Sequence, residues 1–313
     1  MPDKICVIIF TCDRPDDLRR ALDSVVRQAF GDIQLIVVNN GTAIKTNEIL
    51  DSYNSRVIKD TTKRLSYLFN LGWKNTDSEF IGYLADDAEI KPDWIKAGIN
   101  TLHKYPDAAV VTGPLVSPYE FTGEMHALYQ KASKNPFLRF ISGFYDKFIL
   151  EGKTFEPCVL CESGSYTLGQ GFMPNFMQER EVDLATTSSM IFRRSAIESI
   201  GGFDENFMFN HADGDLFVRL KKRGYKIIYN PNMRAIHYIR IGPSRYPFFI
   251  GRDTAYFYLK DVRPHSLRGA LAALSNIIVL NVYWLYKTIQ LRELRQLTGL
   301  TGFIKGIIDF IMR

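Results

Sequence analysis

The stretch ICVIIFTCDRPDDLRRALDSVVRQ, residues 5–28, changes its pattern in the middle. Residues 5–10 form an unbroken apolar run of the length expected for a buried strand. Pro15 with the acidic pair Asp16 and Asp17 then marks a helix start. Apolar residues follow at helical spacing, at Leu18, Leu22, Val25, Val26 and Ala29. The stretch therefore predicts a core strand that leads directly into an amphipathic helix.

The same alternation continues along the chain. Strand-like runs occupy residues 33–38, 80–84 and 108–111, with helical stretches between them, and a helix at 215–223 precedes a strand at 225–229. Strongly apolar strands that alternate with helices indicate a parallel sheet covered on both faces. We therefore predict an α/β fold of Rossmann-like type, with a mainly parallel sheet and helices on both faces.

Composition limits the classes of function. The chain has 313 residues, of which 46% are hydrophobic and 23% charged, so it is long and apolar enough to bury a full core. Its net charge of +5 is too dispersed for a nucleic-acid-binding stripe, but it suits contact with phosphates or lipid headgroups. Cys158 and Cys161 form a lone CxxC, and together with Cys6 and Cys12 we interpret them as reduced thiols. This interpretation, with an apolar N-terminal run too short for a signal peptide, favours a cytoplasmic protein.

Polar residues follow three of the predicted strands. These segments are Thr11-Cys12-Asp13-Arg14, Asn39-Asn40-Gly41 and Ala85-Asp86-Asp87-Ala88. Ligands of parallel sheets bind beyond the carboxyl ends of the strands, so we expect the three loops to open on one edge. Two adjacent carboxylates beside a buried strand repel each other unless a cation or donors compensate them. Asp86 and Asp87 therefore suggest a divalent metal, although a solvated turn is an equally good interpretation of the pair alone.

Two further segments carry titratable side chains. His211-Ala212-Asp213-Gly214-Asp215 precedes the predicted helix at 215–223, where an aspartate is either a helix cap or a base for an acceptor hydroxyl. His237 ends an apolar stretch, and a lone histidine there is more often a structural residue than a ligand.

Six segments, taken in order, resemble the motif series of glycosyltransferase family 2. They are VIIFTCDRPDDLRRALDSVVRQ, IQLIVVNNGT, EFIGYLADDAEIKPDWI, GGFDENF, HADGDLFVRLKKRGYKIIYNP and AIHY, within residues 4–240. The segment from Tyr246 onward resembles rhamnosyltransferase-like members more loosely. A single motif of this kind is weak, whereas six in order are a specific signal.

The resemblance implies a GT-A fold and an inverting transfer from a nucleotide-sugar donor that is a UDP-, dTDP- or GDP-sugar. It implies Mg2+ or Mn2+ bound by Asp87 and His237, and Asp213 as the general base. It places six residues at the donor, namely Thr11, Asp13, Arg14, Asn40, Arg64 and Asp86. The acceptor is then a glycan or a lipid-linked sugar, in polysaccharide or glycolipid biosynthesis, with no role for nucleic acid.

The sequence departs from the family pattern at three positions. Ala85 and Ala212 stand where many relatives have a carboxylate, and Asn40 stands where an aspartate commonly accepts from the N3 proton of uracil. An asparagine accepts through its oxygen but also donates. These departures motivate an alternative, a non-catalytic binding module of the same fold, against which Asp87, Asp213 and His237 together argue. A processive synthase is a third hypothesis, but the QxxRW motif typical of that group is missing near Gln290 and Gln296.

The pattern predicts a catalytic domain over residues 1–245 and a helical region over residues 246–313. Within the catalytic domain we assign 1–113 to nucleotide-sugar binding and 114–245 to the acceptor. Residues 269–286 are uncharged and apolar but interrupted by asparagines, which favours an interfacial helix over a membrane span. A second apolar stripe follows at residues 303–311. We expect peripheral attachment to the cytosolic face of the membrane, with packing on the catalytic domain or in a homodimer as the alternative.

Overall fold

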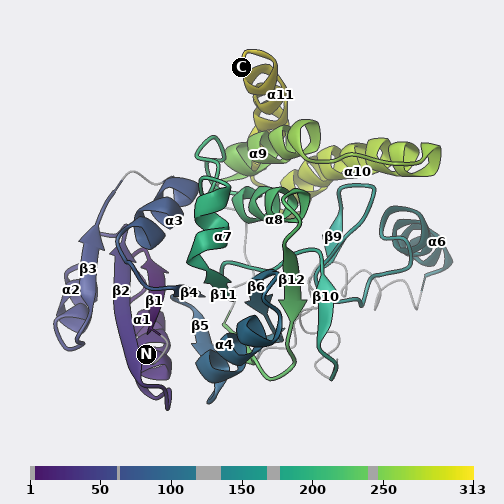
Figure 1. Cartoon of the computed structure of the whole chain (residues 1–313). Coiled ribbons are helices and arrows are strands. Elements are labelled where there is room, and N and C mark those ends of the chain that lie inside the picture. Colours follow the sequence, from purple (N-terminus) through teal and green to yellow (C-terminus); the bar gives the residue numbers. More distant parts are fainter. Residues whose placement is uncertain (1–3, 62–63, 118–134, 168–176, 239–245) are drawn as a thin grey trace. The chain divides into compact units, whose positions relative to one another are not determined.

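The computed structural model describes residues 4–61, 64–117, 135–167, 177–238 and 246–313 (Figure 1). These residues group into two units. The first takes its residues from 1–118, 174–206 and 212–239, and the second from 119–173, 207–211 and 240–313. Residue 245, where the predicted catalytic domain ends, lies outside the described residues. The division into residues 1–245 and 246–313 stays a prediction.

An eight-stranded sheet forms the centre of the first unit, in the order β10-β12-β6-β11-β4-β1-β2-β3. The strands are β1 (Lys4–Thr11), β2 (Asp32–Asn39), β3 (Arg56–Lys59), β4 (Phe80–Ala85), β6 (Ala108–Thr112), β10 (Arg180–Val182), β11 (Ser189–Arg193) and β12 (Lys226–Tyr229). Strand β1 pairs in parallel with β2 and β4, and β2 with β3 and β6 with β12 do the same. Strands β11 and β10 run antiparallel to their neighbours. The predicted α/β class with a mainly parallel sheet is confirmed, with β11 as an antiparallel insertion.

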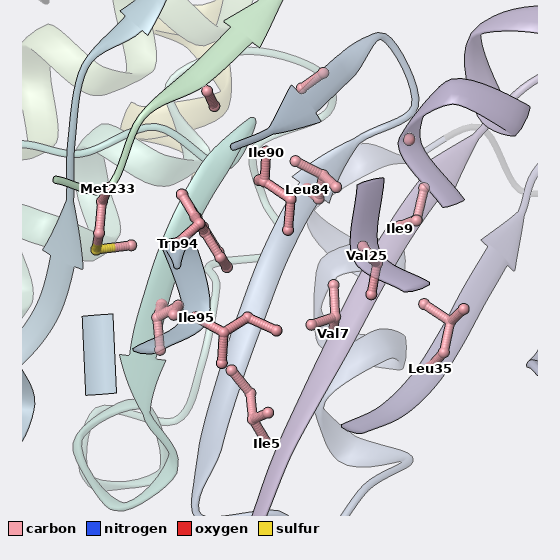
Figure 2. Packing of buried hydrophobic residues seen from close by; sticks show 14 of the residues in the cluster. Ile5, Val7, Ile9, Val25, Leu35, Leu84, Ile90, Trp94, Ile95 and Met233 are labelled. Carbon is pink, nitrogen blue, oxygen red and sulfur yellow. The ribbon is translucent and has the colours of Figure 1, made fainter. Parts of the chain in front are cut away.

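Successive residues of β1 supply both layers of the core, because the side chains of a strand alternate between its faces. Ile5, Val7 and Ile9 point to one face, where they pack with residues such as Val25 and Trp94 (Figure 2). The other face carries an aromatic cluster in which Phe10 lies edge-on to Phe69, with ring centroids 4.8 Å apart, and to Tyr83 at 4.9 Å. Burial on both faces explains why the strand is continuously apolar.

Helices of the first unit connect the strands. They are α1 (Pro15–Val26), α2 (Ile44–Leu50), α3 (Leu65–Lys74), α4 (Trp94–Lys104), α7 (Arg194–Ser199) and α8 (Ala212–Lys222). Helix α1 begins with Pro15 at its first position and Asp16 and Asp17 in its first turn, as its sequence predicts. A small sheet of β5 (Ala88–Ile90), β13 (Ala235–His237) and β7 (Leu115–Val116) brings the chain after Asp87 beside the strand that ends at His237.

The second unit is mainly helical. Its elements are α6 (Pro136–Phe144), the π-helical turn η1 (Tyr145–Ile149), the strand pair β8 (Val159–Leu160) and β9 (Tyr166–Thr167), α9 (Pro247–Lys260), α10 (Leu267–Leu291), the 3₁₀ turn η2 (Leu294–Leu297) and α11 (Thr298–Ile311). The predicted C-terminal helices are confirmed. None of the four cysteines, all of which lie in the described residues, forms a disulfide, and Cys158 and Cys161 are buried.

Helix α10 has two unlike faces. Its buried residues form one stripe, at Gly269, Ala272, Ala273, Asn276 and Trp284. Large apolar side chains form the opposite, exposed stripe, at Leu267, Leu271, Leu274, Ile278, Val282, Leu285 and Ile289. The helix has 25 residues and so extends beyond the apolar stretch 269–286 noted in the sequence. Only 28% of its most apolar 18-residue segment is buried. Among the described helices it alone has the length and apolarity to cross a membrane.

Candidate active site

The loops that follow β1, β2 and β4 open on one edge of the sheet, as predicted. A cavity of about 260 Å³ lies there. Its walls include six of the nine predicted site residues, Thr11, Arg14, Asn40, Asp86, Asp87 and His237. The parallel register brings the first five together, because Thr11 lies opposite Asn39 and Phe10 lies opposite Ala85 at the strand ends. The antiparallel pairing of His237 with Ala88 places the histidine beside Asp87.

A network of hydrogen bonds joins the two carboxylates to their neighbours. The Thr11 hydroxyl donates to Asp86 Oδ2 at 2.8 Å. Arg14 Nη1 bridges the pair, at 3.2 Å from Asp86 Oδ1 and 2.9 Å from Asp87 Oδ2. His237 Nε2 lies 3.0 Å from Asp87 Oδ1. Both aspartates are less than a tenth exposed, so the guanidinium supplies the positive charge that their burial requires.

The environments of the two carboxylates differ. Burial raises the pKa of Asp86 to about 6, against the opposing influence of Arg14 and of the Thr11 hydroxyl. Burial also acts to raise the pKa of Asp87, but its hydrogen bond to His237 and the charges around it outweigh burial and leave that pKa lowered. Asp87 is therefore firmly ionised at neutral pH, as a metal ligand must be.

His237 is oriented by Asp87 and leaves one ring nitrogen without a partner. With Nε2 against the carboxylate, Nδ1 is buried and forms no hydrogen bond. A carboxylate that holds one histidine nitrogen while the other faces an ion is the usual arrangement around metal-ligating histidines. The orphaned Nδ1 is the strongest structural sign that this histidine has a ligand to bind.

The donor set fits a divalent ion whose coordination is completed by substrate. Mg2+ and Mn2+ are commonly held by one or two carboxylates plus phosphate oxygens, and imidazole is an accepted ligand of Mn2+. Asp86, Asp87 and His237 supply these groups. The described residues contain no group of three or more His, Cys, Asp or Glu with the spacing of a complete protein metal site. A diphosphate would therefore have to provide the remaining ligands.

The side-chain amide of Asn40 has a fixed orientation. Its Nδ2 donates to the carbonyl oxygen of Asp60 at 2.6 Å, and its backbone N–H donates to the carbonyl oxygen of Thr11 at 2.9 Å. A carbonyl oxygen requires a donor, so the nitrogen of the amide must face Asp60. The oxygen of Asn40 is left as the group that can accept from a nucleobase N–H.

Asp13 and Arg64 are not among the residues that line this cavity. Asp13, in a left-handed conformation, accepts the backbone N–H groups of Thr42 at 2.8 Å and Ala43 at 2.6 Å, and so holds the loop that leads into α2. Arg64 donates to the carbonyl oxygen of Glu205, in the GGFDENF segment. Their predicted contacts with the donor stay predictions.

Asp213 lies in the first turn of α8, outside the cavity wall but linked to it. Its Oδ1 accepts the N–H of Gly214 at 2.9 Å, and the backbone of Thr187 also bonds to its carboxylate. Burial raises the pKa of Asp213 despite these bonds. Asp215 is fully buried and forms an ion pair with Arg219 at 2.7 Å. Its role is therefore to stabilise helix α8.

Thr187 and Ser188 also line the cavity, and neither was predicted from the sequence. They precede β11, whose antiparallel insertion beside β4 carries them to the carboxyl end of that strand. No local motif marks them, because their position depends on a strand pairing more than a hundred residues apart in the chain.

Comparison with known proteins supports the same family. Residues 6–201 match the sequence profile described as glycosyl transferase family 2. The chain is similar to the O-antigen biosynthesis protein RfbC of Myxococcus xanthus, with 25% identity over 75% of this chain and 17% of that protein. It is also similar to an N-acetylglucosaminyl-diphospho-decaprenol L-rhamnosyltransferase of Mycobacterium tuberculosis, with 32% identity over 32% of this chain and 36% of that protein. The matches thus span well under half of either relative.

The fold has a counterpart among solved structures. A mannosyltransferase of Pyrobaculum calidifontis, solved with GDP-mannose and Mn2+, superposes with a TM-score of 0.55 at 13% identity. The superposition covers 99% of this chain and 90% of that one. At this identity the likeness shows the fold alone, and that fold is GT-A, as the motif series implied.

Proposed function

The chain belongs to glycosyl transferase family 2 and is a glycosyltransferase, and from that premise we propose an inverting, metal-dependent transfer of a sugar from a nucleotide-sugar donor to an acceptor hydroxyl. The observation that carries the proposal is the network of Thr11, Arg14, Asp86, Asp87 and His237 at the carboxyl ends of β1 and β4. It gathers compensated carboxylates and an unpartnered imidazole nitrogen where open α/β sheets bind ligands.

Asp87 and His237 would hold the Mg2+ or Mn2+ ion, with Asp86 beside it near the ribose and the donor sugar. When bound there, such an ion would supply positive charge against the negative charge that develops on the departing diphosphate. Arg14 is 44% exposed at its side chain, so it can exchange its carboxylate contacts for the donor phosphates. That the Pyrobaculum mannosyltransferase was solved with Mn2+ supports this assignment by analogy.

Asn40 would recognise the nucleobase through its oxygen. A uracil or thymine N3–H needs an acceptor, and the contact with Asp60 leaves the oxygen of Asn40 available for that purpose. Uridine and thymidine donors suit this geometry directly. Guanine also presents N–H donors, and the Pyrobaculum enzyme was solved with GDP-mannose, so a guanosine donor is retained as the second choice.

Asp213 is our candidate for the general base. A carboxylate whose pKa is raised by burial is a better proton acceptor near neutral pH. In the proposed step the acceptor hydroxyl gives its proton to Asp213 while its oxygen bonds to the anomeric carbon. The bond from that carbon to the diphosphate oxygen breaks on the opposite face, which inverts the configuration. The Thr187 backbone bond ties this aspartate to the cavity wall.

Replacement of the base tests the mechanism. Asp213→Asn keeps the size of the side chain but removes its ability to accept a proton, so we expect turnover to fall by about a hundredfold or more. Donor affinity, measured by calorimetry, should change little. Transfer within a factor of a few of the wild-type rate would place the base elsewhere, and NMR of the product's anomeric configuration tests inversion independently.

We further propose that the enzyme works at the cytosolic face of a membrane, in cell-surface polysaccharide or glycolipid synthesis. The printed names of the relatives mention O-antigen biosynthesis and a diphospho-decaprenol, a lipid. The exposed apolar stripe of α10 would provide the contact with lipid. Among basic residues of this region, Lys305 pairs with Asp309 and Arg295 with Glu293. These ion pairs leave less positive charge available to anionic headgroups, so we expect burial of the apolar side chains to contribute to attachment as well.

A further inference from the structure

A second cavity, of about 470 Å³, lies within the second unit and shares no lining residue with the first. Ile250, Thr254 and Tyr258 recur every four residues on α9 and form one wall. A stripe of α10 that includes Asn276 and Leu280 forms another. Short segments at 164–166 and 210–211, with η2 and α11, complete its lining. The volume suits a small organic ligand.

The lining combines aromatic rings with uncharged polar groups. Five of the fifteen lining residues are aromatic, namely Tyr166, Tyr258, Tyr283, Trp284 and Phe303. The carboxamides of Asn276 and Gln296 are each only 1% exposed. Among the described residues of the lining, Lys287 is the one with a permanent charge, and none is acidic.

Asn276 presents an unused hydrogen-bond acceptor. Its Nδ2 donates to the Tyr258 hydroxyl and to the carbonyl oxygen of Ser163, whereas its Oδ1 is buried and has no partner. A buried polar atom without a hydrogen bond destabilises the folded chain. Retaining such an atom in a cavity wall is explained if a ligand donates to it.

His211 presents a second acceptor. Its Nε2 lies 3.2 Å from Thr254 Oγ1, and that hydroxyl itself donates to the carbonyl oxygen of Ile250 at 2.7 Å. Because the hydroxyl proton is already used, His211 Nε2 must carry the proton and Nδ1 must carry the lone pair. Burial lowers the pKa of His211 to about 4, so the ring is neutral at physiological pH.

The segment that carries His211 is held rigidly. Asp253 on α9 accepts the backbone N–H groups of Met208, Phe209 and Asn210 at 2.9, 2.7 and 2.9 Å through one oxygen. The His211 ring also stacks on Phe257, with centroids 4.8 Å apart and planes within 9°. Only Ala212 separates His211 from the candidate base Asp213 in the chain.

We propose that this cavity binds an uncharged sugar ring of the acceptor, an inference that rests on the proposed function. Sugar hydroxyls donate to the acceptors Asn276 Oδ1 and His211 Nδ1, and aromatic rings cover the apolar faces of the sugar. A nucleotide would need several cations, and the described lining offers only Lys287. An alkyl chain could not donate to Asn276 Oδ1 and would leave this buried oxygen without a hydrogen bond, which is costly.

Binding of neutral sugars to the full chain, without donor or metal, tests the proposal. We would record saturation-transfer NMR with the methyl glycosides of glucose, galactose, mannose and N-acetylglucosamine. At least one should bind, and Leu280→Trp, which fills the cavity, should weaken that binding about tenfold or more. Val282→Trp makes a similar change on the 54% exposed face of α10 and should leave binding unchanged.

Two further measurements keep the test decisive. Leu280→Trp must still bind a nucleoside diphosphate with Mn2+ as the wild type does, which shows that it is folded. If it does not fold, Tyr283→Ala replaces it and should also lose the glycoside by removing an aromatic wall. Glycoside binding that persists in a folded Leu280→Trp protein, or absence of binding by all four glycosides, would overturn the proposal. Since no turnover is measured, failure of the transfer mechanism would not affect the result.

Discussion

Asp253 shows how much structure one side chain can hold. It is fully buried, one oxygen accepts three backbone N–H groups, and the other accepts Arg252 Nη1 at 2.7 Å. Asp253→Asn should destabilise the fold by about 3 kcal/mol or more. The substitution replaces one carboxylate oxygen by an NH2 group, which is a donor and would face other donors. Urea unfolding measures the change.

The exposed Asp16 provides the matched control for that substitution. It pairs with Lys45 at 2.9 Å and is 76% exposed at its side chain. Asp16→Asn should change stability far less than Asp253→Asn does, because water screens an exposed ion pair. Equal effects of the two substitutions would show that the backbone contacts of Asp253 contribute little.

Single residues also mark the limit of what the sequence could predict. Six of the fifteen residues that line the cavity beside Asp86 were predicted. Thr11, Arg14, Asn40, Asp86 and Asp87 lie at or just after strand ends, where the strand and loop pattern pointed to them, whereas His237 was assigned only through the family resemblance. The hydrogen bonds from the backbone of residues 208–210 to Asp253 were not predicted. They join segments 43–45 residues apart, and no local sequence motif marks them. The orientation of the Asn40 amide likewise depends on Asp60, a partner that only the folded chain identifies.

At the scale of elements, α9 and α11 approach so closely that glycine is required between them. A Cβ added to Gly302 would lie 2.0 Å from the carbonyl oxygen of Phe248, and one added to Gly306 would lie 2.1 Å from that of Arg252. Both clashes are with backbone, which cannot move aside without separating the helices. Gly302→Ala should therefore lower the melting temperature of the protein.

Gly143 in α6 is the control, because a Cβ there meets nothing within 4 Å. Gly143→Ala should be neutral or stabilising by up to about 1 kcal/mol, as expected for alanine in an open helix position. A Gly302→Ala protein that melts at or above the wild-type temperature would contradict the close packing of the two helices.

The local spacing of apolar residues predicted most elements of this fold. It could not predict which distant segments pair with one another. The sequence predicted five elements, because the apolar residues of each have the spacing of a buried strand or an amphipathic helix. They are strands β1, β2, β4 and β6 and helix α1. The antiparallel position of β11 between β4 and β6 was not predicted, since an apolar run does not reveal its neighbours. In α10, Asn276 looked like an interruption of an apolar helix, yet it belongs to the buried face.

For the whole molecule, the exposed stripe of α10 predicts attachment to a membrane. We expect the full chain to float with liposomes that contain anionic lipid, and the paired change Leu274→Asp with Ile278→Asp to reduce flotation strongly. Both positions are 56% exposed, so the fold should tolerate the change. Val26→Asp, at a 65% exposed position on α1, is the matched control and should float as the wild type does.

The opposite outcome has a clear alternative meaning. The wild type could instead fail to float and sediment as a dimer, with the Leu274→Asp and Ile278→Asp variant sedimenting as a monomer. The stripe would then be an interface between copies of the chain. Equal flotation of wild type and paired variant would remove α10 from the account of membrane contact.

We propose above all that the edge of the sheet at Asp86 and Asp87 binds a nucleoside diphosphate together with a divalent ion. The most direct measurement is calorimetric titration of UDP, dTDP and GDP into the protein with Mn2+ and again with a chelator. We predict that at least one diphosphate binds with Mn2+ and that the chelator weakens this binding by about tenfold or more. Asp87→Asn should remove the metal dependence while the protein stays folded. Binding that is equally tight with and without the ion, or an Asp87→Asn protein whose metal-dependent affinity equals that of the wild type, would contradict this proposal.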